Sequence, residues 1–162
     1  MTDDELERLA AGDLDACRAK GLKIAVAESC TGGLIAGTLT AIAGSSDVID
    51  RGFVTYSNEA KSEMLGVPPE LIAEHGAVSR QVAEAMAAGV LAYSVADISA
   101  AVTGVAGPGG GTDQKPVGLV HIAAARNGGE KRHEEHVFGG DRGAVRAAAV
   151  NSSLLLLSSI LD

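Results

Sequence analysis

The sequence predicts a single α/β domain, a three-layer α/β/α sandwich around a mostly parallel mixed sheet of about five strands. The chain has 162 residues, and residues 1–162 fall within the range of roughly 100–200 residues that one domain usually has. Short apolar segments of strand length alternate with longer segments at helical spacing, which is typical of a parallel sheet covered on both faces. The turn Asn127-Gly128-Gly129 joins the last two strand-like segments and predicts an antiparallel hairpin there.

Glycine, proline and capping residues mark the ends of the predicted helices. A side-chain oxygen at the N-cap satisfies free N–H groups of the first turn, and a glycine after the last turn ends the helix. The predicted helices are residues 5–20, ended by Gly21; 31–43, closed by Gly44; 58–65, stopped by Gly66; a short helix from Pro69 to near His75; 79–95, with Ser79 as its N-cap; and a final helix capped by Asp141 and running to residue 161.

Five apolar or alternating segments between these helices are predicted strands. Hydrophobic residues make up 46% of the chain but aromatic residues only 2%, so the core around the strands must be built from Ala, Val, Leu and Ile. The predicted strands are residues 22–27, 48–57, 98–102, 118–125 and 130–138.

Charge and composition exclude several classes of protein. The net charge of −8 argues against a nucleic-acid surface, which needs clustered Lys and Arg. No segment has the roughly 18 apolar residues of a membrane span, and the acidic N-terminus does not resemble a signal peptide. Two cysteines, Cys17 and Cys30, make no disulfide framework. We therefore expect a reduced, cytoplasmic protein that binds neither nucleic acid nor membranes, and in which a local set of basic residues holds any anionic ligand.

The most informative segment is the turn Ala27-Glu28-Ser29-Cys30-Thr31-Gly32-Gly33, between a predicted buried strand and a predicted helix. Such a turn exposes a side-chain oxygen at the carboxyl edge of a sheet and aims backbone N–H groups at a ligand. The alternative is an ordinary helix cap, with Thr31 at the N-cap and glycines for a tight turn. Cys30 is an alternative nucleophile to Ser29, although no neighbouring charge lowers its pKa and cysteine is often a small buried hydrophobe.

A second glycine-rich segment, Thr103 to Gly111, leaves the third predicted strand at the edge where ligands bind in open α/β sheets. Thr103, Gly104 and Gly107 lie nearest the strand, and glycines there allow close approach of the backbone to a ligand. The alternative is a flexible surface loop. The segment lacks the Gly-Lys-Ser/Thr ending of a P-loop and the spacing of a dinucleotide fingerprint, so no cofactor is expected.

Three basic residues stand where the helix dipole disfavours them. Lys61 lies in the first turn of its predicted helix, Arg142 directly follows the cap Asp141, and Arg146 follows one turn later on the same face. Each alone could belong to a solvated surface, at a cost of only ~0.3–1 kcal/mol. Together, beside helix starts that favour anions, they predict a site for a phosphate or a carboxylate.

The histidines support neither a metal site nor a serine triad. His133 and His136 are three apart in a predicted strand, so their side chains point to opposite faces. A hydrolase built on this chain therefore needs a less common base. Lys61 or Tyr56, at the end of the second predicted strand, could reach a serine at the end of the first, provided that burial or cationic neighbours lower the lysine pKa.

Five linked motifs follow one another along the chain: residues 27–33, residues 52–61, residues 75–79, residues 103–108 with 115–118, and residues 138–142. Together they resemble the C-terminal domain family of the competence/damage-inducible protein CinA, and the match runs from about residue 5 to 161. The resemblance implies hydrolysis of the carboxamide of nicotinamide mononucleotide to nicotinate mononucleotide and ammonia, within pyridine nucleotide recycling. It also implies Ser29 as nucleophile.

The residues and the resemblance together predict one amidase site in a homodimer. The N–H groups around Thr31 and Gly32 are expected to form an oxyanion hole, Arg142 to hold the substrate phosphate, and Glu28 either to face the cationic ring or to support the loop. A homodimer is expected because two predicted helices, residues 79–95 and 141–161, are apolar over wide faces. The competing class is a non-catalytic module that senses a nucleotide or binds a protein. The predicted catalytic residues are Ser29, Lys61 and Tyr56, and the predicted substrate-binding residues are Glu28, Thr31, Gly32, Gly33, Thr103, Gly104, Gly107 and Arg142.

Overall fold

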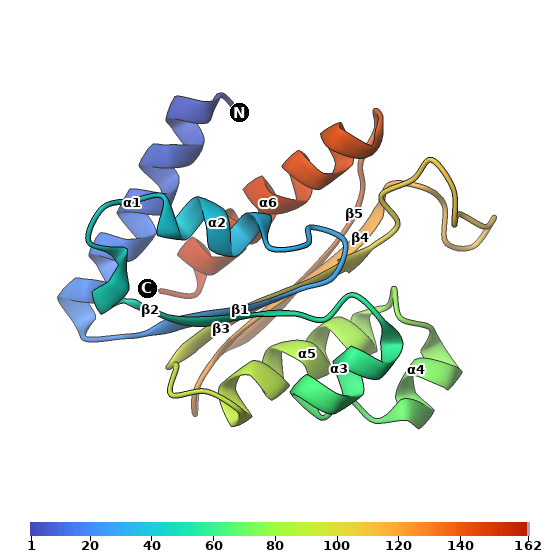
Figure 1. The fold of residues 1–162 in the computed structure, drawn as a ribbon, viewed down its shortest axis with the longest axis horizontal. Helices are drawn as coiled ribbons and strands as arrows, with labels where there is room; N and C mark the ends of the chain where they lie inside the picture. The colour runs from blue at the N-terminus through green and yellow to red at the C-terminus, as the bar shows by residue number, and fades with distance from the viewer. Residues whose placement is uncertain (162) are drawn as a thin grey trace.

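A five-stranded sheet lies between two layers of helices in the computed structural model, which describes residues 1–161 (Figure 1). Helices α1, α2 and α6 cover one face of the sheet, and α3, α4 and α5 cover the other (Figure 1). The predicted three-layer α/β/α sandwich is therefore confirmed. The elements are α1 (Asp3–Lys20), β1 (Ile24–Glu28), α2 (Leu34–Thr40), the 3-10 turn η1 (Ser45–Asp47), β2 (Ile49–Val54), α3 (Asn58–Leu65), α4 (Pro69–His75), α5 (Arg80–Ala92), β3 (Ile98–Gly104), β4 (Leu119–Arg126), β5 (Lys131–Val137) and α6 (Arg142–Ser159).

The sheet is mixed, with strand order β2-β1-β3-β4-β5. Strand β1 pairs in parallel with β2 and β3, whereas β3–β4 and β4–β5 are antiparallel. The sequence predicted antiparallel pairing only for the last two strands. Strand β4 also reverses direction because residues 105–118 contain no helix, and a parallel return usually needs a crossover helix.

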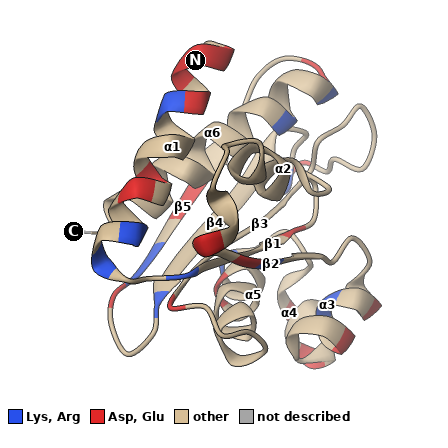
Figure 2. Cartoon of the chain, turned by 60° about the vertical axis from the view of Figure 1, so that its left-hand side comes forward, with Lys and Arg blue, Asp and Glu red and all other residues tan. Residues whose placement is uncertain are grey.

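Local signals set most element boundaries where they were predicted. The side chains of Ser79 and Asp141 cap α5 and α6, as predicted, and Ser57, which was expected at the end of the second strand, caps α3. In α1, three acidic residues in the first turn (Figure 2) and Arg18 and Lys20 in the last turn complement the helix dipole. Helix α2 begins three residues later than predicted.

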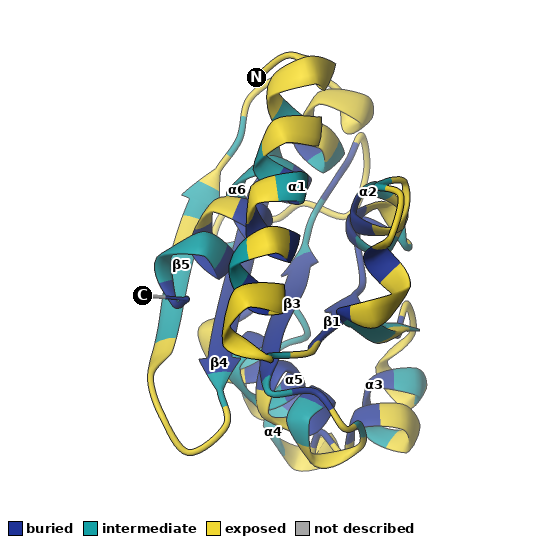
Figure 3. Cartoon of the chain, turned by 90° about the vertical axis from the view of Figure 1, so that its left-hand side faces the viewer, coloured by how far each residue is buried: buried dark blue, intermediate teal, exposed yellow. Residues whose placement is uncertain are grey.

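The two faces of the sheet carry cores of different kinds. Val26, Val102 and Ile122 pack toward α1, α2 and α6, whereas the alanines beside them, such as Ala101 and Ala123, pack under α5. Figure 3 shows the central strands largely buried and the edge strand β5 partly exposed. The small alanine side chains let α5 lie close to the sheet.

Helix α3 packs closely on α5 because Gly89 leaves room for it. A Cβ atom at Gly89 would overlap the backbone carbonyl of Leu65. Leu65 and Lys61 are four residues apart on α3, so they share one face of the helix, and both are buried. The contact that buries Leu65 therefore also directs Lys61 into the protein.

The two helices expected to drive dimerisation bury most of their apolar side chains within this chain. Val82, Met86 and Val90 of α5 are buried. In the run of four leucines of α6, only Leu155 is exposed, at 50%. The apolar faces are thus explained by the core, and the sequence argument for a dimer loses this part of its support. Within residues 1–161, no helix is both long and apolar enough to cross a membrane.

Candidate active site

The carboxyl ends of β1, β2 and β3 meet at one edge of the sheet and open into a cavity of about 320 Å³. The predicted meeting of the Ser29, Tyr56 and Thr103 segments at one edge is confirmed. Residues from five separate segments line the cavity: Ser29, Cys30, Tyr56, Asn58, Lys61, Ala77, Val78, Thr103, Gly104, Val105, Ala106, Gly107, Gly109, Gly110 and Arg142.

Ser29 and Lys61 form a hydrogen-bonded pair in this cavity. The Lys61 Nζ atom lies 3.1 Å from Ser29 Oγ and 2.9 Å from the carbonyl oxygen of Thr55. The lysine is 1% exposed, and within residues 1–161 no carboxylate lies within 4 Å of it. Burial lowers the pKa of Lys61, opposed only by a nearby Cys30. A neutral amine beside a serine hydroxyl can accept the serine proton.

The start of α3 brings Lys61 to the serine. Ser57 caps the helix by accepting a hydrogen bond from the N–H of Ala60 at 3.0 Å, and the Ser57 carbonyl accepts from the N–H of Lys61. The basic residue that the helix dipole disfavours in this turn thus points into the cavity and away from solvent. The capped start of α3 therefore explains why a lysine occupies this turn.

Glu28 supports the nucleophile turn from inside the protein. Its carboxylate accepts hydrogen bonds from Thr31 Oγ1 at 2.6 Å and from the N–H groups of Ile35 and Ala36 at 2.8 and 3.0 Å. Glu28 therefore replaces an N-cap side chain for α2, whose N-cap residue is Gly33 and not Thr31. Glu28 is 1% exposed and outside the cavity lining. Of the two alternatives for Glu28, the contacts therefore favour support for the loop, and its place among the predicted substrate-binding residues is corrected.

Gly32 and Gly33 shape the turn and do not line the cavity. Both have positive φ, 57° and 107°, a conformation that glycine adopts without steric cost. The N–H of Gly32 donates to the carbonyl of Ser29 at 3.0 Å. It is therefore not free to bind an oxyanion, and the prediction that it would do so is wrong. Within residues 1–161, no other residue accepts a hydrogen bond from the N–H groups of Cys30 and Thr31.

Cys30 is poorly suited to act as the nucleophile. Its thiol packs into the core, and burial raises its pKa to about 11. A Cβ atom at Gly104 would lie 3.2 Å from Cys30 Sγ and 2.8 Å from a methyl group of Val120. The thiol is thus buried beside the end of β3 in its protonated form, whereas Ser29 lies beside a base.

The opposite wall contains the second glycine-rich segment. Thr103 donates from its hydroxyl to the carbonyl of Ala77 at 2.9 Å and so joins β3 to the loop before α5. Gly107 has a φ of 84°, and a Cβ atom there would lie 2.5 Å from Val117. Thr103, Gly104 and Gly107 all line the cavity, as predicted.

Arg142 spans the mouth of the cavity. Its Nη1 donates to the carbonyl of Gly107 at 2.7 Å, and its Nη2 donates to the hydroxyl of Tyr56 at 3.1 Å. Within residues 1–161 no carboxylate pairs with this guanidinium. Tyr56 is 61% exposed, so its ring lies at the entrance, and only its backbone carbonyl contacts Lys61.

Arg146 does not join Arg142 in the cavity, although the sequence predicted a shared anion site. Its guanidinium donates instead to the carbonyls of Cys30 and Thr31. Outside the two glycine-containing segments, residues 27–33 and 103–111, the lining residues that were not singled out as site residues are Asn58, Ala77 and Val78. Asn58 follows the cap of α3, and the other two precede the cap of α5, so proximity to a helix start was the available signal.

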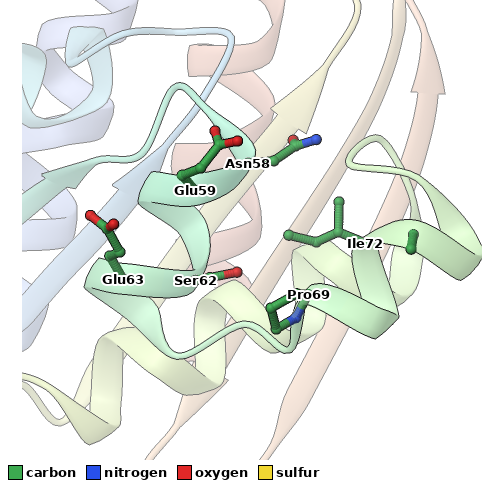
Figure 4. A pocket seen from close by; sticks show the side chains of 7 residues that line it. Asn58, Glu59, Ser62, Glu63, Pro69 and Ile72 are labelled. Carbon is green, nitrogen blue, oxygen red and sulfur yellow. The ribbon is translucent and has the colours of Figure 1, made fainter.

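A second hollow, of about 410 Å³, lies between α3 and α4 and shares only Asn58 with the cavity (Figure 4). Glu59 and Glu63 stand on its rim, and Pro69 and Ile72 contribute apolar surface (Figure 4). It has neither a basic side chain nor a paired nucleophile. The cavity with Ser29 and Lys61 is therefore the candidate site for an anionic substrate.

Comparison with known proteins agrees with this architecture. The chain is 48% identical over 157 residues to the nicotinamide-nucleotide amidohydrolase PncC of Escherichia coli K12, covering 97% of this chain and 95% of that protein. It is 54% identical over 144 residues to a CinA-like protein of Geobacter sp. M21, but it spans only 34% of that protein's length. The crystal structure of the competence/damage inducible protein CihA from Agrobacterium tumefaciens has 50% identity and a TM-score of 0.96, covering 100% of this chain and 98% of that one. The profile of the CinA C-terminal domain matches residues 6–161, and the chain belongs to that family.

Proposed function

We propose that this protein is a nicotinamide-nucleotide amidohydrolase, which converts nicotinamide mononucleotide and water to nicotinate mononucleotide and ammonia. The observation that carries the proposal is the buried Ser29–Lys61 pair, 3.1 Å apart in a cavity at the sheet edge. The near full-length match to an E. coli protein of that name supplies the substrate class.

Ser29 is proposed as the nucleophile and Lys61 as the group that moves its proton. Neutral Lys61 takes the hydroxyl proton as Ser29 Oγ attacks the carboxamide carbon. The C–N bond then breaks, and the Lys61 ammonium returns that proton to the departing nitrogen, which leaves as ammonia. In a second step water attacks the acyl-enzyme with Lys61 again as base, and nicotinate mononucleotide and free Ser29 result.

The tetrahedral intermediate needs donors for its oxyanion. The N–H groups of Cys30 and Thr31 follow the nucleophile directly and are free of other acceptors within residues 1–161. They are proposed as the oxyanion hole, in place of the pair Thr31 and Gly32 expected from the sequence. Gly32 instead keeps the turn closed through the Ser29 carbonyl.

Arg142 and Tyr56 are proposed to bind the rest of the nucleotide. The guanidinium of Arg142 has only neutral partners, a carbonyl and a hydroxyl, so a phosphate would gain a charge-assisted hydrogen bond there. The exposed ring of Tyr56 at the mouth can stack on the pyridinium ring. Because its hydroxyl contacts Arg142, we assign Tyr56 to binding, and Lys61 alone to proton transfer.

A homodimer and a cytoplasmic location remain proposals. The dimer rests on the family resemblance, since α5 and α6 bury their apolar faces within one chain. A mass of twice 16.3 kDa by light scattering at micromolar concentration would support it, and a monomeric mass would contradict it. The cytoplasmic location follows from the expected substrate, an intracellular nucleotide.

Ammonia release from nicotinamide mononucleotide by the purified protein tests the proposed activity. Ser29→Ala and Lys61→Met should each lower kcat by about 10³-fold or more, while nucleotide binding by calorimetry and the melting temperature stay near those of the wild type. Methionine is chosen because it fills the volume of buried Lys61 without a charge. Cys30→Ser serves as the control and should retain turnover.

Two outcomes would contradict this assignment. Nucleotide binding without ammonia release by the wild type would favour the sensing module. Normal turnover in Ser29→Ala together with its loss in Cys30→Ser would transfer the nucleophilic role to the thiol.

A further inference from the structure

Arg146 is a guanidinium without a carboxylate partner, placed against the nucleophile turn. Its Nε donates to the carbonyl of Cys30 at 3.1 Å, and its Nη2 donates to the carbonyl of Thr31 at 3.2 Å. A Cβ atom at Gly32 would lie 3.4 Å from Nη2, so the guanidinium lies directly on the turn. Within residues 1–161 no Asp or Glu lies within 4 Å of it. Both hydrogen bonds of the guanidinium therefore go to carbonyls of successive peptides.

The first of these hydrogen bonds orients the N–H of Thr31. In a planar trans peptide the carbonyl and the following N–H point in opposite directions. Within residues 1–161, Arg146 is the only donor to the Cys30 carbonyl. Holding that carbonyl therefore directs the N–H of Thr31 away from the guanidinium, where it has no protein acceptor.

The second hydrogen bond acts through one further peptide. The Thr31 carbonyl accepts hydrogen bonds from both Arg146 and the N–H of Leu34, the latter at 3.0 Å, and together they fix the direction of the N–H of Gly32, which donates to the Ser29 carbonyl at 3.0 Å. The Ser29 carbonyl is then fixed as well, and the N–H of Cys30 points the opposite way. Arg146 thus sets the direction of the Thr31 N–H and, together with the N–H of Leu34, supports that of the Cys30 N–H.

We propose that Arg146 is a positioning residue that holds the Cys30 and Thr31 N–H groups toward the oxyanion of the tetrahedral intermediate. This inference rests on the proposed amidase function. Lysine cannot replace arginine in this role, because a single ammonium cannot serve two successive carbonyls with the planar geometry of a guanidinium.

Arg51 provides a matched control on the same protein. Its Nη1 donates to a backbone carbonyl, that of Tyr93, at 3.2 Å, and its Nε pairs with Asp50 at 2.6 Å. Arg51 lies on β2 outside the cavity lining. Arg51→Gln removes a guanidinium–carbonyl contact of the same kind, together with this ion pair, without touching the nucleophile turn. Any general effect of losing such a contact should appear in this variant too.

The test compares Arg146→Lys and Arg146→Gln with Arg51→Gln. Loss of one oxyanion donor commonly lowers kcat by about 10²–10³-fold, and misdirection of two donors should lower it by about 10²-fold while KM for nicotinamide mononucleotide changes little. Arg51→Gln should keep both constants. Unchanged kcat in both Arg146 variants of an active enzyme would overturn the inference while leaving the proposed function intact.

A second readout does not depend on turnover. In ¹H–¹⁵N spectra, both Arg146 variants should shift the amide signals of Cys30, Thr31 and Gly32, and Gly32 should exchange faster with solvent, whereas Arg51→Gln should leave these signals in place. Unchanged signals would overturn the inference even if the wild type released no ammonia. Absence of ammonia release with shifted signals would overturn only the proposed function.

Discussion

Asp13 offers a direct test of how burial sets the stability of this fold. The residue lies on the face of α1 toward α6 and is 3% exposed. One carboxylate oxygen accepts a hydrogen bond from the hydroxyl of Ser158, and the other has no partner within residues 1–161. Burial raises the pKa of Asp13 from 3.8 to about 7, and the hydrogen bond from Ser158 only partly opposes it.

The raised pKa implies that folding is weakened as the pH rises. The folded state holds the Asp13 proton more tightly than the unfolded state. The contribution of this proton to the free energy of unfolding is therefore fully present below pH 3.8 and is lost as the pH rises to about 7. A difference of about 3 pKa units at 1.36 kcal/mol each corresponds to about 4 kcal/mol. Above pH 7, the charged carboxylate should therefore cost the fold an amount of that order.

Asp13→Asn should remove this cost because the amide keeps the volume and an acceptor for Ser158 but carries no charge. Urea unfolding at pH 8 should show a variant more stable than the wild type by up to about 4 kcal/mol, and the difference should shrink toward zero at pH 4. Asp15→Asn, on the exposed side of the same helix, controls for a general charge effect. A variant no more stable at pH 8, or an advantage independent of pH, would refute the argument.

Three further predictions concern the site. Arg142→Gln should raise KM for nicotinamide mononucleotide by about 10- to 100-fold, because one charged hydrogen bond to the phosphate is lost. KM for nicotinamide riboside, which has no phosphate, should change little, and an equal rise of KM for both substrates would indicate a structural role. Because burial lowers the pKa of Lys61 and the base must be neutral, kcat should fall as the pH decreases through an apparent pKa below 10.5, and a flat profile down to pH 5 would exclude lysine as the base. Gly104→Ala should destabilise the fold by about 1–3 kcal/mol in urea, since its Cβ would lie 2.8 Å from Val120, and unchanged stability would mean that the strand contact is loose.

The features that the sequence predicted well depend on single residues acting locally. Ser79 and Asp141 each cap the helix expected, since a cap needs only one side chain and the N–H groups two or three residues ahead. Chain order then places the first three strands in one direction. Their carboxyl ends, with Ser29 and Thr103, come to one edge as a consequence of topology.

The features that the sequence did not predict depend on which way a side chain points at a turn, or on a contact with a residue far along the chain. Glu28 ends β1, and the pattern alone left open whether its carboxylate faces the cavity or the turn. The positive φ of Gly32 and Gly33 brings the first N–H groups of α2 back onto it. The contact of Arg146 with Cys30 joins residues 116 positions apart, and no local signal on α6 distinguishes it from Arg142.

The placement of carboxylates connects the base with the binding of an anion. The protein has an excess of acidic residues, with a net charge of −8, yet Glu28, at the end of the nucleophile strand, is satisfied by Thr31 and two N–H groups of α2. It is thus unavailable to pair with Lys61, and pairing with a carboxylate would raise the lysine pKa and oppose the effect of burial. Arg142, at the mouth of the same cavity, has neutral partners only, so its charge remains available for a phosphate. The hydrogen bonds of Glu28 favour a neutral base, and those of Arg142 leave a charge for an anionic substrate in the same cavity.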